Sequence, residues 1–284
     1  MNKKITLICT NGTFKYVKDY VYSFIKYVNL ELYIINTMTP IEEISNIINK
    51  NQLLIFIQGI PYDLHHLIQN KKYFILNIEQ LCNHKKIKYI ANEQNIIDYS
   101  VENLILAQTK LNIPNLFYFP YGYNPNEIHN FEKTKNMAII ANYKNIRRCK
   151  IMNDLASLNC EFTNIDGTFS EKRDNILFRH KILVNIHFDQ NYMIHENMRC
   201  DRCIFNKMIV ISEKSLFDDK LPLNKFMILV NYDELVETAL TISNNYEFYY
   251  NKIFVEQDFD KFIETYKIEL QNTYDTEINK MINY

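Results

Sequence analysis

The chain has 284 residues, of which 47% are hydrophobic, and its formal net charge is -1. This length and apolar content allow two modest domains with buried cores, and they exclude global disorder. The near-neutral charge argues against a surface that coats nucleic acid, because such surfaces are usually basic. Only 4 glycines are present, and neither G-x-G-x-x-G nor G-x-x-x-x-G-K occurs. Dinucleotide-binding and P-loop sites would therefore lack their defining backbone chemistry.

The start of the chain and its cysteines predict a cellular compartment. The first residues, MNKKITLICT, carry lysines before an apolar run that is too short for a signal peptide. No stretch approaches the roughly eighteen apolar residues of a membrane span. The 6 cysteines are scattered, which favours free thiols in a reducing compartment. We therefore expect a soluble cytoplasmic protein, or one of the host cytoplasm if the source is a virus.

The first part of the chain alternates strand and helix patterns. A turn at 11–13, Asn-Gly-Thr, is expected to let the backbone approach a ligand. This alternation predicts parallel βαβ units in a Rossmann-like layer. Strands are expected at Ile5–Cys9, Leu30–Ile35, Leu53–Gln58, Tyr73–Leu76 and Leu116–Phe119, with the stretches Lys88–Ala91 and Asp98–Ser100 before the last of them. Helices are expected at Val17–Val28, Pro40–Ile48, His65–Gln69 and Val101–Leu111.

A cluster of Pro and Gly at Pro120–Pro125 indicates a hinge, and a second α/β run follows it. Strands are expected at Met137–Ala141, Cys160–Ile165, 181–186, 208–212 and Lys225–Val230. Helices are expected at Asn145–Leu158, Glu171–Phe178 and Asp233–Asn244, and the tail 246–284 is expected to be helical. The predicted fold class is α/β. The predicted domains are 1–119, 120–250 and a helical tail, 251–284, that packs back on the first domain.

Polar side chains gather between the two buried strands of the segment 181–213. They are Asn185, His187, Asp189, Glu196 and Arg199. In an open α/β sheet, ligands bind at the carboxyl ends of the strands. The loop after residue 185 is therefore the first candidate for a site.

Several blocks, in a fixed order, resemble a known family. They are N-I-E-Q-L at 77–81, D-Y-S-x-x-N at 98–103, P-Y-G-Y at 120–123, K-I-x-x-N-I-H at 181–187, E-x-x-R at 196–199 and S-E at 212–213. This ordered set resembles a group of GT-B-type glycosyltransferases found in bacteria and large viruses. The resemblance spans roughly residues 70 to 245.

The resemblance implies two Rossmann-like domains facing a cleft, with the nucleotide-sugar on the C-terminal domain and the acceptor on the N-terminal one. The implied activity is transfer of a sugar from a UDP- or GDP-linked donor to a hydroxyl group, in the assembly of a glycan or glycoconjugate. It also implies no essential metal and no other cofactor. Its partners would be the nucleotide-sugar and a glycan acceptor. The alternative is a catalytically silent GT-B-like protein that binds a partner or a glycan.

The resemblance places Glu196 on the donor ribose at the start of a helix, where free N–H groups can bind a diphosphate. Arg199 follows one helical turn later and can complete a phosphate contact. Further candidates on the donor side are Arg147, Arg148, Lys144, Asn185 and Gly122.

Candidate catalytic residues are His187, Asp189 and Glu79. Many retaining members of the fold carry two glutamates eight residues apart, the second on the ribose. Eight residues before Glu196 the chain has Phe188, so the sequence does not imply a retaining mechanism.

Each candidate also has a purely structural interpretation. Glu196 and Arg199 could form a solvated i,i+3 ion pair worth a few tenths of a kcal/mol, and His187 could be a core histidine. The arginines at 147 and 148 could form an exposed pair, and Glu79 could cap a helix.

Cys200 and Cys203 form a single C-x-x-C motif near two histidines. A zinc site is disfavoured because the motif lies within a predicted helix and lacks a second pair of ligands.

Overall fold

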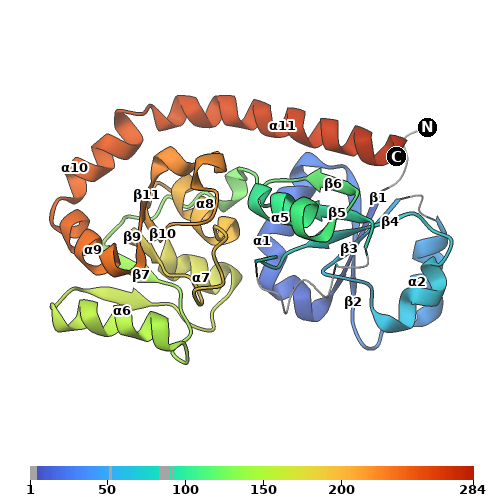
Figure 1. The fold of residues 1–284 in the computed structure, drawn as a ribbon, viewed down its shortest axis with the longest axis horizontal. Helices are drawn as coiled ribbons and strands as arrows, with labels where there is room; N and C mark the ends of the chain where they lie inside the picture. Colours follow the sequence, from blue (N-terminus) through green and yellow to red (C-terminus); the bar gives the residue numbers. More distant parts are fainter. Residues whose placement is uncertain (1–4, 51–52, 83–89, 91–92) are drawn as a thin grey trace. The chain divides into compact units, whose positions relative to one another are not determined.

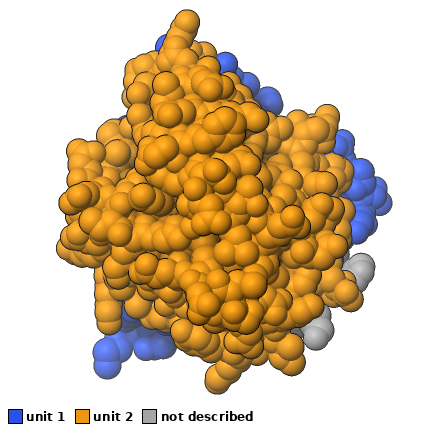
Figure 2. Space-filling view, turned by 90° about the vertical axis from the view of Figure 1, so that its left-hand side faces the viewer, with its two compact units in different colours: residues 1–122, 268–284 blue, residues 123–267 orange. Residues whose placement is uncertain are grey.

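The computed structural model describes residues 5–50, 53–82, 90 and 93–284, and they form two compact units (Figure 1). The N-terminal unit comprises residues 1–122 and 268–284, and the C-terminal unit comprises residues 123–267. Figure 2 colours the two units separately. Of the predicted stretch Lys88–Ala91, residues 88, 89 and 91 lie outside the described residues.

The N-terminal unit is built on a six-stranded parallel sheet in the order β2-β1-β3-β4-β5-β6. Its central strands are continuous apolar runs, as parallel strands buried on both faces require. The strands are β1 (Ile5–Thr10), β2 (Leu30–Ile35), β3 (Leu53–Ile57), β4 (Tyr73–Asn77), β5 (Asn95–Asp98) and β6 (Asn115–Tyr118).

The helices of this unit follow their strands in the predicted order. They are α1 (Asn11–Tyr27), α2 (Ile41–Lys50), α3 (His65–Ile68) and α5 (Val101–Leu111). The expected turn at 11–13 is wrong, because these residues form the first turn of α1. The Thr10 side chain accepts a hydrogen bond from the backbone N–H of Thr13 (3.3 Å) and caps the helix there.

The last residues of the chain complete the core of the N-terminal unit. The buried Tyr274 hydroxyl donates to the carbonyl of Pro120 (2.7 Å), and its ring lies 5.0 Å from that of Phe119 and 4.9 Å from that of Tyr27. Gly122 is required beside this cluster, because a Cβ there would lie 2.5 Å from a ring carbon of Tyr27. Burial of these aromatic rings therefore ties 268–284 to the first sheet.

The C-terminal unit has a five-stranded parallel sheet in the order β11-β10-β9-β7-β8. The strands are β7 (Lys135–Ile139), β8 (Phe162–Asn164), β9 (His180–Asn185), β10 (Ile209–Glu213) and β11 (Met227–Val230). Its helices are α6 (Ile146–Ser157), α7 (Ser170–Leu177), α8 (Asn197–Phe205), α9 (Leu235–Asn244) and α10 (Tyr246–Tyr250), and a π-helical turn at Asn251–Val255 leads to the long α11 (Phe259–Asn283).

The start of α11 belongs to the C-terminal unit. Phe254, Phe259 and Ile263 are buried, and the Phe259 ring lies 4.9 Å from that of Phe226. These buried apolar side chains thus pack the start of the tail into the core of the C-terminal unit. Among the described residues, none of the helices combines the length and the apolarity that crossing a membrane requires. The predicted fold class, two Rossmann-like α/β units with a helical tail, is confirmed.

Candidate functional site

The strand order of the C-terminal unit creates a switch point between β7 and β9. The chain passes from β7 to β8 on one side and then returns to β9 on the other side of β7. The loops that leave β7 and β9 therefore diverge at their carboxyl ends, where α/β sheets bind ligands. A cavity of about 430 Å³ opens there, lined by Asn142, Lys144, Asn145, Ile146, Arg147, Phe188 and Asp189. We call it the switch-point cavity.

Glu196 lies immediately before α8 and is held by two arginines. Its carboxylate accepts a hydrogen bond from Arg199 (2.8 Å) and forms an ion pair with Arg148 (3.5 Å). The side chain of Glu196 is 19% exposed, so the pair is more than a solvated surface contact. Burial alone would raise the pKa of Glu196, but Arg199 and Arg148 outweigh it and hold this pKa below its usual value. Glu196 is therefore an ionised acceptor of hydrogen bonds.

Asn185, at the end of β9, positions this pair. Its amide oxygen accepts a hydrogen bond from Arg199 (2.8 Å), and its amide nitrogen donates to the hydroxyl of Ser212 on β10 (3.0 Å). Both groups of the buried amide are satisfied, which fixes its orientation. The predicted donor-side residues Asn185, Glu196 and Arg199 are thus brought together.

Arg147 and Arg148 begin α6 and engage protein groups. Arg148 is buried and donates to the carbonyl of Ile186 (2.8 Å). The pKa of Arg148 is lowered to about 10, chiefly by burial and also by the neighbouring Arg199, while Glu196 partly opposes the shift. Arg147 lies over the ring of Tyr232 (3.8 Å to the ring centroid) and donates to the carbonyl of His187 (3.2 Å). The interpretation as an exposed surface pair does not fit these contacts.

Glu213 is the partner that sequence reasoning did not assign to the site. It ends β10, receives a two-pronged hydrogen bond from Arg147, and accepts another from the backbone N–H of His187 (2.6 Å). Its side chain is buried. Glu213 therefore fixes the first residues of the loop after β9. The sequence shows that Glu213 ends a buried strand, but only the strand order places that strand next to β9.

His187 and Asp189 occupy the loop after β9. His187 is buried, and its Nε2 has no hydrogen-bond partner among the described residues. Burial lowers its pKa, which favours the neutral imidazole. Asp189 lines the switch-point cavity, and one of its carboxylate oxygens accepts from the backbone N–H of Asn191 (2.6 Å).

Lys144 and the first turn of α6 supply positive potential at the cavity. Lys144 is exposed, and its ammonium has no ion-pair partner within the described parts of the chain. Asn145 caps α6 by accepting from the N–H of Arg148 (2.9 Å), and its amide donates to the carbonyl of Phe188 (2.6 Å). A helix N-terminus beside an unpaired cation is suited to an anion.

Glu79 and Gly122 belong to the N-terminal unit. Glu79 accepts a hydrogen bond from Gln58 (2.8 Å), which directly follows β3 and has a positive φ of 66°. Gly122 packs against the α1 residues Ser23 and Tyr27, so its need for glycine comes from close packing. These two candidates therefore belong to a different unit from the cluster around Glu196.

The blocks at 77–81 and 98–103 form one buried network. The carboxylate of Asp98 accepts from the side chains of Asn77 (2.6 Å) and Asn103 (3.2 Å) and from the N–H of Ser100 (2.8 Å). The Asn103 amide also donates to the carbonyl of Glu79 (3.0 Å). The polar residues at and just after the ends of β4 and β5 thus fix the backbone that carries the Glu79 side chain.

Cys200 and Cys203 are buried within α8, and burial raises the pKa of both thiols. Over the described ranges, no group of three or more His, Cys, Asp or Glu side chains could hold a metal ion. These thiols therefore belong to the buried core of the C-terminal unit.

No protein-family model matches the chain. A mimivirus protein, "Uncharacterized protein L140" of Acanthamoeba polyphaga mimivirus, is 32% identical over 252 residues, which cover 84% of this chain and 80% of that protein. The chain belongs to the family of this viral protein. A second protein of the same virus, "Uncharacterized protein L138", is 31% identical over 260 residues, but the match covers only 28% of it.

Two solved structures have the same fold as this member of the viral family. TarM superposes with a TM-score of 0.53 at 14% identity, over 81% of this chain and 54% of TarM. AviGT4, a glycosyltransferase involved in avilamycin A biosynthesis, gives a TM-score of 0.56 at 8% identity, over 94% of this chain and 98% of its own. The fold of the chain is therefore GT-B, as its sequence blocks predict.

Proposed function

We propose that the protein is a glycosyltransferase that moves a sugar from a nucleoside diphosphate donor to a hydroxyl group of a glycan or glycoconjugate. The observation that carries the proposal is the ionised Glu196, held by Arg199 and Arg148 beside the switch point of the C-terminal sheet. A carboxylate can accept two hydrogen bonds, which suits the two hydroxyl groups of a ribose. The GT-B fold supports this assignment.

In this proposal the diphosphate binds at the helix starts of α6 and α8. Lys144 and the free N–H groups of those helices supply positive potential without a large reorganisation. Arg199 remains paired with Glu196 and contributes its remaining N–H donors. These groups would stabilise the departing diphosphate, so we propose transfer without an essential metal and without a further cofactor.

The proposed chemistry at the sugar involves the loop after β9. His187 Nε2 is a buried nitrogen without a partner in the described structure, which is costly unless a ligand hydroxyl supplies one. Asp189 faces the switch-point cavity and could bind a sugar hydroxyl. Glu79, in the N-terminal unit, remains the proposed contact for the acceptor.

Binding of UDP and GDP by calorimetry tests the donor side. A variant of S. aureus TarM has been crystallised with UDP, so UDP is the first probe. We expect Glu196→Gln to weaken binding at least tenfold, because it removes a charge-assisted acceptor. Glu237→Gln, which changes an exposed carboxylate on α9, is the matched control and should bind as the wild type does. Equal affinity of both variants, or no nucleotide binding at all, would contradict the proposal.

A donor-hydrolysis assay separates an enzyme from a silent binding protein. Purified protein incubated with UDP- and GDP-linked sugars should release the nucleoside diphosphate slowly, since water can replace the acceptor. Binding of a nucleotide without any release of product, with or without candidate acceptors, would favour the silent alternative.

A further inference from the structure

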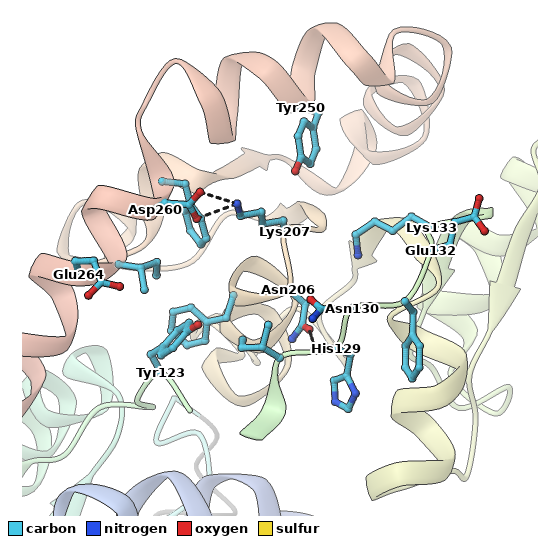
Figure 3. A pocket seen from close by; sticks show the side chains of 15 residues that line it. Tyr123, His129, Asn130, Glu132, Lys133, Asn206, Lys207, Tyr250, Asp260 and Glu264 are labelled. Atoms are coloured by element: carbon cyan, nitrogen blue, oxygen red, sulfur yellow. Dashed lines mark hydrogen bonds and ion pairs between the residues drawn. The ribbon is translucent and has the colours of Figure 1, made fainter. Parts of the chain in front are cut away.

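A second cavity of the C-terminal unit lies at the opposite end of the strands from the switch-point cavity. Its volume is about 730 Å³ (Figure 3). It is bounded by the segment before β7, by the end of α8 and by the start of α11. The segments 128–133 and 205–207 precede β7 and β10, so this cavity lies at the amino ends of the strands, whereas the switch-point cavity lies at their carboxyl ends. We call it the amino-edge cavity.

Lys133 is a lysine of this cavity that has no carboxylate partner among the described residues. Two of the acidic residues in its wall already have partners, because Asp260 pairs with Lys207 (2.8 Å) and Glu264 pairs with Lys267 (2.7 Å). The carboxylate of Glu132 points away from the Lys133 amine, which extends into the cavity (Figure 3).

The Lys133 ammonium is only partly satisfied. Among the described residues it donates one hydrogen bond, to the carbonyl of Phe178 at 3.5 Å, although an ammonium has three donors. Burial lowers the pKa of Lys133 to about 8, which reflects the cost of a cation that has lost water without gaining an anion. A bound anion would remove this cost.

The rest of the wall suits a ring or another apolar body. The aromatic side chains are those of Tyr123, Phe131, Phe205, Tyr250 and Phe259. The hydroxyl of Tyr250 points toward the cavity in Figure 3 and has no hydrogen-bond partner within the described chain. A cavity with aromatic walls and a few converging polar groups is the usual form of a small-molecule site.

We propose that the amino-edge cavity binds a small organic anion, with its carboxylate or phosphate group on Lys133 and its apolar body against Phe259 and Tyr250. The site is separate from the donor site in the fold, and it stands whether or not the proposed transfer activity is correct. The amide of Asn206, between α8 and this cavity, is already bonded to the carbonyls of Glu127 and Arg202. The anion therefore relies on Lys133 for its charge.

Calorimetric titration with phenyl phosphate, phenylacetate and the neutral phenylacetamide tests the proposal. At least one anion should bind, and the neutral amide should bind at least tenfold more weakly. Lys133→Met should lower the affinity for the anion at least tenfold. The stronger of the two anions identifies the head group. Lys172→Met, an exposed lysine on α7, is the matched control and should leave binding unchanged. Thermal unfolding of each variant checks that it is folded, and Tyr250→Phe provides a second probe should Lys133→Met fail to fold.

Two results would overturn the proposal. One is that neither anion binds at millimolar concentration. The other is that binding survives Lys133→Met undiminished in a folded variant, which would place the anion elsewhere on the protein. Failure of nucleotide binding would leave the result for the organic anions untouched.

Discussion

Arg147 and Glu213 meet although 66 residues separate them in the chain. Their hydrogen bonds join the start of α6 to the end of β10, and Glu213 also holds the N–H of His187. The proximity of Glu196 and Arg199 could be predicted, because i,i+3 residues share a helix face. The role of Glu213 could not, because it depends on which strands are neighbours.

Glu213→Gln should therefore destabilise the protein. The substitution leaves the guanidinium of Arg147 without its anion. The cost is reduced because the Arg147 side chain is 23% exposed and water can solvate it in part. We expect a loss of roughly 1 to 3 kcal/mol in the free energy of unfolding. Urea unfolding measures it, with Glu237→Gln as the exposed control within about 0.5 kcal/mol of wild type. A loss no larger than that of the control would mean that this ion pair contributes little.

Asp98 predicts a pH dependence of stability in the N-terminal unit. Burial raises its pKa from 3.8 to about 7, and the hydrogen bonds from Asn77, Ser100 and Asn103 only partly oppose this. Between these two pH values the folded state keeps a proton that the unfolded state has lost. The contribution of Asp98 to stability is therefore largest near pH 4 and falls as the pH rises to about 7.

Comparison with Asp98→Asn isolates this effect, because asparagine does not titrate while the histidines titrate in both proteins. The free energy of unfolding of the wild type, taken relative to that of the variant, should fall by roughly 2 to 4 kcal/mol between pH 4 and pH 7. Urea unfolding at several pH values measures the difference. A constant difference would show that Asp98 is ionised in the folded protein throughout this range.

At the scale of elements, the sequence predicts most strands and helices but not their ends. Thr10 extends α1 back over residues 11–13 by capping it, and this favours helix over the turn that Asn-Gly suggests. The short strand β5 (Asn95–Asp98) has polar residues at both ends, and the expected stretch 98–100 overlaps it only at Asp98, so periodicity alone does not predict this strand. Capping and sheet pairing decide these boundaries, and both depend on tertiary structure.

The cap of α6 links stability to the candidate site. Asn145→Ala removes the acceptor for the N–H of Arg148 and the bond to the carbonyl of Phe188, so we expect a loss of about 1 to 2 kcal/mol. Asn153→Ala, at an exposed position of the same helix, is the matched control and should change the unfolding free energy by less than about 0.5 kcal/mol. Equal losses in urea unfolding would show that the cap is not stabilising.

At the scale of the molecule, the ordered blocks were sufficient to predict the GT-B fold. The position of the site within that fold needed the strand order, which places β9 beside β7 although β8 lies between them in sequence. That crossover creates the switch point. It brings residues 142–147 and 188–189 around one cavity and sets Glu196 at the start of α8 nearby. No periodicity in the sequence specifies this neighbour relation.

A crystal structure of the protein with UDP or GDP tests the central claim most directly. The claim predicts the ribose hydroxyls within hydrogen-bond distance of the Glu196 carboxylate and the diphosphate at the first turn of α6 or α8, near Lys144. A nucleotide bound in the amino-edge cavity, or one whose ribose contacts no carboxylate of the C-terminal unit, would contradict it.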